Sequence, residues 1–123
     1  MSNDKKHIFL VDDDLLVLQA GQNMLSEDYQ ITTVDSAEKM FELLESGKPD
    51  LILLDISMPN MNGYEAIEAL KKNEAYKEIP VIFLTGNKDV SVKLKCYSLG
   101  AIDYITKPFD PNALLNRIKL CLM

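Results

Sequence analysis

Short apolar runs alternate with amphipathic segments along the whole chain, and this alternation predicts strands and helices in turn. The clearest run, Leu51–Leu54, has four aliphatic residues in succession, which is typical of a strand buried on both faces of a parallel sheet. Similar runs predict four more strands, at Ile8–Val11, Gln30–Val34, Val81–Leu84 and Ile102–Ile105. Gln30–Val34 is the more polar run, so we expect it at an edge of the sheet.

The segments between these runs predict helices. In the first segment, Leu15, Leu18 and Leu25 are expected on one side of a helix. The second helix has Asp35 or Ser36 as its N-cap. Its apolar residues follow the helical spacing i, i+3, i+4 and i+7, at Ala37, Met40, Phe41 and Leu44. The other three helices are expected at about Tyr64–Asn73, within Asp89–Leu99, and from Asp110 onward with Pro111 in the first turn.

Strands that alternate with helices imply βαβ units, right-handed crossovers and a parallel sheet with helices on both faces. Five such units match a flavodoxin-like, doubly wound α/β fold with a five-stranded sheet of order 2-1-3-4-5. Residues 1–123 are therefore expected to form a single domain. The switch point of this fold lies between strands one and three, which would bring Asp12, Asp13 and Asp14 beside Asp55.

The composition is that of a globular domain, with 47% hydrophobic and 26% charged residues. A net charge of −6 and a pI of about 4.7 argue against unaided binding of nucleic acid or anionic membrane, and they suit a protein that binds cations. No run has the length of a transmembrane helix, and the start, MSNDKK, is polar and lacks a signal-peptide pattern. Cys96 and Cys121 lack metal-ligand spacing, which indicates reduced thiols in a cytoplasmic protein.

Polar residues that could bind a ligand or take part in a reaction follow each of four strands. Asp12–Asp14 follow the first, Asp55 the third, Thr85 the fourth and Lys107 the fifth. Two carboxylates about 5 Å apart repel by roughly 1–3 kcal/mol, so a cluster of them requires a cation. All available ligands are oxygen atoms, which points to Mg²⁺, with Mn²⁺ as a substitute, and away from Zn²⁺.

In such a site Asp55 is the natural nucleophile for a phosphoryl group. Lys107 would pair with the carboxylates and with the incoming group, and Thr85 can donate a hydrogen bond to it. Simpler interpretations remain open at this point. Asp55 could merely cap its strand, Asp12–Asp14 could be a solvated helix start, and Tyr104 could be an ordinary core residue.

Four motifs in order, VDDD, LLDISMPNMNG, VIFLTG and DYITKPF, make the chain resemble the receiver domain of bacterial two-component response regulators. The resemblance runs from about His7 to Leu122. It implies that Asp55 accepts a phosphoryl group from a sensor histidine kinase, a phosphotransfer protein or a small phosphodonor. It also implies slow self-dephosphorylation, because Ser57 and Asn87 are neither acids nor strong bases.

The resemblance further assigns the metal ligands and the switch. Asp12, Asp13, Asp55 and the backbone carbonyl of Ser57 would hold Mg²⁺, with Asp13 the closer of the acidic pair, and Asp14 would begin the helix cap. Thr85, Lys107 and Tyr104 would form the switch, with Tyr104 turning inward as Thr85 moves toward the phosphoryl group. The Lys107–Pro108 peptide would be cis.

A receiver is a phosphoacceptor and not a turnover enzyme. Its helix 4–strand 5–helix 5 surface would contact a downstream protein, a fused output domain or a second copy of the chain. The polar start suggests that the receiver comes first, and the chain is either a stand-alone regulator or a domain excised from a longer one. Two alternatives are a haloacid-dehalogenase-type phosphatase, with a DxD pattern at Asp12–Asp14, and a flavin or nucleotide binder. The phosphatase alternative gives Asp55 no role. The flavin or nucleotide binder would need a Gly-rich or Ser/Thr-rich phosphate-binding loop, which the chain lacks after its first strand.

Overall fold

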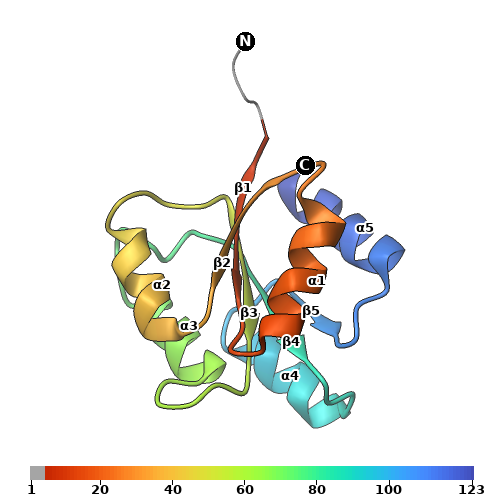
Figure 1. Cartoon of the computed structure of the whole chain (residues 1–123). Coiled ribbons are helices and arrows are strands. Elements are labelled where there is room, and N and C mark those ends of the chain that lie inside the picture. Colours follow the sequence, from red (N-terminus) through yellow and green to blue (C-terminus); the bar gives the residue numbers. More distant parts are fainter. Residues whose placement is uncertain (1–4) are drawn as a thin grey trace.

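The computed structural model describes residues 5–123, so the first four residues of the polar start lie outside the described part. Within it, strands and helices alternate without exception (Figure 1). The strands are β1 (His7–Val11), β2 (Gln30–Val34), β3 (Leu51–Asp55), β4 (Val81–Thr85) and β5 (Asp103–Thr106). The helices are α1 (Leu15–Leu25), α2 (Ala37–Leu44), α3 (Gly63–Lys71), α4 (Val90–Ser98) and α5 (Pro111–Leu122).

The five strands form one parallel sheet in the order β2-β1-β3-β4-β5, which confirms the predicted topology. The more polar strand β2 lies at an edge, as expected. Val11, the last residue of β1, is opposite Leu54 in β3, and Asp55 is opposite Leu84 in β4. The residues that leave these strands therefore emerge at the same edge of the sheet, on either side of the switch point.

The sheet separates two apolar cores. Helices α1 and α5 cover one face, and α2, α3 and α4 cover the other (Figure 1). Every residue of β3 and β4 is buried, as the continuous apolar runs predicted. The core residues contributed by helices to the first face include Leu18, Leu25, Leu114 and Ile118, and those contributed to the second include Met40, Leu44, Ile67, Leu70 and Cys96.

Side-chain caps start four of the helices, α1, α2, α3 and α5, and at α5 the cap is Asp110, which accepts the Ala113 N–H. Asp14 accepts a hydrogen bond from the Leu16 N–H at the start of α1, and Ser36, one of the two predicted candidates, caps α2. Asn62 and Glu65 form a reciprocal capping box at α3, since each side chain accepts from the other's backbone N–H. These caps fix where each helix begins relative to the strand before it.

The predicted boundaries of β5 and α3 are wrong. Strand β5 begins at Asp103, because Ile102 lies in the preceding turn with its side chain 48% exposed. Helix α3 ends at Lys71, before the predicted Asn73, whose side-chain oxygen instead accepts the Ala75 N–H in a local turn. Leu15 is 72% exposed, because α1 starts directly beyond the end of β1 and its first turn lies at the rim of the sheet.

The loop between β3 and α3 is closed tightly at Gly63. The Gly63 N–H donates to the carbonyl oxygen of Ile56 at 2.8 Å. A Cβ atom at residue 63 would overlap the backbone carbonyl oxygen of Asp55, so only glycine allows this approach. Within the same loop Asn60 takes a positive φ of 70°, a conformation that asparagine tolerates better than most residues. The loop is thereby held against the residue that ends β3.

None of the helices in the described residues is both long enough and apolar enough to cross a membrane. Cys96 is a buried residue of α4, Cys121 is half-buried in α5, and both are free thiols.

Candidate functional site

The polar residues predicted to meet at the carboxyl edge of the sheet do meet there. Asp55 is the last residue of β3 and Thr85 the last of β4. The backbone holds the two remaining segments in place. The Asp12 N–H donates to the Val34 carbonyl at 3.0 Å, and the Lys107 N–H donates to the Thr85 carbonyl at 2.8 Å.

Three carboxylates form a compact cluster at this edge. One oxygen each from Asp12, Asp13 and Asp55 lies within 4.8 Å of the others. Asp12 is fully buried, Asp55 is 3% exposed and Asp13 is exposed, so the cluster opens to solvent on one side. Asp14 caps α1 and does not join the three, so the second aspartate of the DxD pattern in the phosphatase alternative lies outside the cluster.

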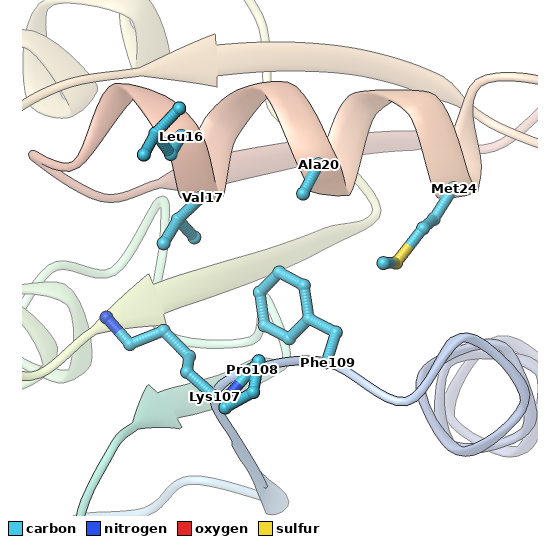
Figure 2. Close-up of a pocket in the computed structure, with 7 residues that line it drawn as sticks. All are labelled: Leu16, Val17, Ala20, Met24, Lys107, Pro108 and Phe109. Atoms are coloured by element: carbon cyan, nitrogen blue, oxygen red, sulfur yellow. The ribbon is translucent and has the colours of Figure 1, made fainter.

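Lys107 neutralises part of this charge. Its Nζ donates to Asp12 Oδ2 and to Asp55 Oδ1, both at 3.0 Å. Figure 2 shows the side chain extended from the segment after β5, with the amino group toward the carboxyl end of a neighbouring strand. Burial lowers the pKa of Lys107, but the hydrogen bonds to Asp55 and Asp12 outweigh it and raise that pKa, which keeps the amino group charged.

Burial raises the pKa of Asp55 to about 6, from 3.8. The hydrogen bond from Lys107 opposes this rise, the charge of Asp12 adds to it, and a hydrogen bond from the Ser57 backbone N–H opposes it again. The buried carboxylate therefore gains from any additional positive charge placed beside it.

The donor set fits a hard divalent cation. It consists of oxygen atoms only, it carries more negative charge than Lys107 balances, and its open side leaves room for water and for a phosphoryl oxygen. Among the described residues, no imidazole or thiolate belongs to this cluster. Mg²⁺ thus suits Asp12, Asp13 and Asp55.

Two further predicted residues lie on β4 and β5. Thr85 is 5% exposed, and its Oγ1 accepts the Asn87 N–H at 3.0 Å and donates to the Asn87 carbonyl at 3.4 Å. Tyr104 is half-buried in β5 and packs partly against the core under α4. The Lys107–Pro108 peptide is cis, as the resemblance implied.

The sequence model of the response regulator receiver domain matches residues 8–119 of the chain. The chain belongs to this family. Receiver domains are phosphoacceptor signalling modules of two-component systems, and residues 8–119 match this class of domain.

Individual relatives agree with the family. The chain is 38% identical over 112 residues to the probable transcriptional regulator ycf29 of Pyropia yezoensis, covering 90% of the chain and 50% of that protein. It is 38% identical over 111 residues to a probable cyclic di-GMP phosphodiesterase of Vibrio cholerae, covering 90% of the chain and 25% of that protein. The chain thus spans about half, or less, of these curated relatives.

A similar solved structure is that of a putative response regulator from Chloroflexus aurantiacus. Its TM-score is 0.91 at 28% sequence identity, and the match covers 97% of this chain and 98% of that one. The flavodoxin-like fold is therefore common to both.

One feature beside the receiver site was not anticipated from the sequence. An apolar pocket of about 240 Å³ lies between α1 and the segment after β5 (Figure 2). It is lined by Leu16, Val17, Ala20, Met24, Lys107, Pro108 and Phe109. The sequence held one signal for an exposed apolar surface here, the adjacent leucines Leu15 and Leu16 at the start of α1, since two successive helical residues point in different directions. Both are more than 70% exposed.

The raised pKa of Asp55 predicts an unusual pH dependence of the metal-free receiver. Because the folded-state pKa of about 6 exceeds the ordinary 3.8, protonation of Asp55 favours the folded state. This stabilisation is complete below pH 3.8 and is lost as the pH rises through about 6.

Urea unfolding with a chelator, for wild type and Asp55→Asn, measures this effect. The asparagine has no proton to lose, so the difference between the two proteins isolates Asp55 from the other carboxylates. We expect wild type to lose free energy of unfolding relative to the variant over this pH range. A difference that does not change with pH would contradict the prediction.

Proposed function

We propose that Asp55 is the phosphoryl acceptor of this receiver. The observation that carries the proposal is a buried carboxylate at the end of β3, paired with Lys107 at 3.0 Å and crowded by Asp12 and Asp13. Such a group needs positive charge to stay ionised, and the same positive charge would attract the oxygens of a phosphodonor. An ionised Asp55 oxygen would then attack phosphorus, with the donor's bond to phosphorus breaking.

The neighbouring residues have distinct parts in this proposal. Mg²⁺ held by Asp12, Asp13, Asp55 and the Ser57 backbone carbonyl would supply charge neutralisation for the phosphoryl oxygens, and Mn²⁺ could replace it. Lys107, already at the Asp55 oxygen, would donate to a phosphoryl oxygen. Thr85 would exchange its bonds with Asn87 for a bond to the same group.

The proposed switch connects Thr85 to Tyr104 and to the helix 4–strand 5–helix 5 surface. Thr85 is opposite Thr106 in the sheet and Phe83 is opposite Tyr104, so Thr85 and Tyr104 lie on neighbouring strands two residues apart in register. The surface beyond carries exposed apolar residues at Val90, Leu94 and Ile102. An exposed apolar surface suits a downstream protein, a fused output domain or a second copy of the chain.

We propose that the phosphodonor is a sensor histidine kinase or a phosphotransfer protein. The apolar pocket beside Lys107 supports this, because a protein that delivers a phosphoryl group to Asp55 must cover the edge of the sheet where the pocket lies. An apolar side chain of such a donor would fill the pocket next to Phe109.

The proposed lifetime of the phosphoryl group is long. Ser57 and Asn87 flank the proposed path of the attacking water, and neither provides an acid or a strong base. The Asn87 side chain is already engaged, since its Oδ1 accepts the Asp89 N–H at 2.8 Å. Slow self-dephosphorylation fits this environment.

For the downstream activity that this receiver controls, we propose only a class of protein. The two curated relatives named above are a transcriptional regulator and a phosphodiesterase, and both extend well beyond the matched region. We propose that residues 1–123 form one receiver domain, acting alone or on a fused output domain, in the cytoplasm, where free Cys96 and Cys121 stay reduced.

The experiment that tests the function is intact mass spectrometry after incubation with acetyl phosphate, with Mg²⁺ or with a chelator. We expect one added phosphoryl group per chain with Mg²⁺ and none without it. Incorporation that is equally fast in chelator would remove the metal from the proposal. No incorporation from acetyl phosphate or from a histidine-phosphorylated donor protein would remove the acceptor function.

A further inference from the structure

The carboxylate of Asp103 joins three elements next to Tyr104. A single oxygen, Oδ1, accepts from Arg117 Nη1 at 2.6 Å, from the Tyr104 N–H at 2.8 Å and from the Tyr97 hydroxyl at 3.3 Å. These donors belong to α5, β5 and α4 respectively. The Asp103 side chain is 22% exposed, so its charge is partly withdrawn from water and the bonds to it are charge-assisted.

The ring of Tyr104 is held between two residues of α4. The Tyr97 ring meets it edge-on, with centroids 6.3 Å apart and planes at 85°. The ammonium group of Lys93 lies 5.4 Å from the centre of the Tyr104 ring. Both geometries are attractive, so the ring cannot move without losing contacts to α4. Because Asp103 holds the Tyr97 hydroxyl, it also holds one of the two residues that confine Tyr104.

The confined ring belongs to the resting arrangement of the site. In the same structure the Thr85 hydroxyl bonds to Asn87 in its own loop and does not reach the carboxylate cluster. Tyr104 is opposite Phe83 in β4, and Thr85 lies two residues further along that strand, on the same face. A contact that fixes Tyr104 therefore stabilises the arrangement in which Thr85 is turned away from Asp55.

We propose that Asp103 is a positioning residue that holds Tyr104 against Tyr97 and Lys93 and so stabilises the resting arrangement. The proposal rests on the proposed function, because it assumes that phosphorylation of Asp55 requires Thr85 and Tyr104 to move. Loosening the hold would raise the population of the arrangement that accepts the phosphoryl group. Asp103 would thereby set how readily the receiver is phosphorylated without touching the reacting atoms.

Asp103→Asn is the direct test, because asparagine keeps the size of the side chain and removes its charge. We expect the rate of phosphoryl incorporation from subsaturating acetyl phosphate to rise about three- to tenfold. Tyr97→Phe, which removes only the hydroxyl, is expected to act in the same direction and more weakly. The matched control is Glu74→Gln, which takes a carboxylate from the exposed Lys77 pair, and its rate should equal that of wild type.

A second comparison separates positioning from a general loss of stability. In a Tyr104→Ala background the ring is gone, so adding Asp103→Asn should change the rate no further. The proposal is overturned by an unchanged or slower rate in Asp103→Asn, or by the same acceleration in the Tyr104→Ala background.

An aromatic NMR spectrum of the unphosphorylated protein distinguishes failure of this proposal from failure of the proposed function. We expect the Tyr104 ring resonances of Asp103→Asn and Tyr97→Phe to shift or broaden, even if wild type accepts no phosphoryl group. Ring resonances identical to those of wild type in both variants would overturn the positioning role. Absence of incorporation in wild type would instead overturn the acceptor function.

Discussion

An Asp55→Asn variant is expected to gain no phosphoryl group under conditions in which wild type gains one. The amide has no nucleophilic oxygen anion to attack phosphorus, whereas its size and shape match the carboxylate. Intact mass measures the gain, and fragmentation of the labelled wild-type protein locates it. Label on the variant would mean that another residue is the acceptor.

The free energy of unfolding of Asp55→Asn controls for misfolding of the variant. Because the pKa of Asp55 is raised to about 6, the ionised carboxylate is unfavourable in the metal-free fold at neutral pH. The neutral asparagine should therefore raise the free energy of unfolding in chelator, by about 1–3 kcal/mol. Lost incorporation together with increased stability cannot come from misfolding. Asp28→Asn, at an exposed position, should behave as wild type in both measurements.

Replacement of Lys107 by methionine should destabilise the metal-free receiver by about 3 kcal/mol. The substitution keeps much of the side-chain volume but leaves Asp12 and Asp55, both nearly inaccessible to solvent, without the cation that each contacts at 3.0 Å. Urea unfolding in chelator measures the loss. Addition of Mg²⁺ should recover part of it, since a cation between the carboxylates replaces some of the missing positive charge.

The same variant should incorporate phosphoryl groups about 100-fold more slowly, because one donor to the transferred oxygens is lost. Lys77→Met is the matched control. Its partner Glu74 is 86% exposed, so that ion pair should contribute less than about 1 kcal/mol and nothing to incorporation. A Lys107→Met protein as stable as wild type in chelator would show that the carboxylates are not ionised together.

The sequence by itself determined the order of the elements, the topology of the sheet and the list of chemical groups at its edge. Strands buried on both faces of a parallel sheet have uninterrupted apolar runs, and the short runs Leu51–Leu54 and Val81–Leu84 match this pattern. Because every parallel strand ends at the same edge, the residues that follow the runs had to converge. Asp55, Thr85 and Lys107 could therefore be selected before any distance was known.

Only the tertiary structure decided which of these groups are in contact. The sequence suggested that Lys107 pairs with the carboxylates and that Asp14 begins the helix cap. Lys107 and Asp12 are 95 positions apart, however, and no local pattern establishes that Lys107 contacts both Asp12 and Asp55. The exposure of Leu15 depended likewise on where α1 begins relative to the sheet. Local periodicity reports which face of an element is apolar, whereas contacts depend on how distant elements pack. Asp103 illustrates the difference: in the sequence it is one acid before Tyr104, and in the fold it joins α4, β5 and α5.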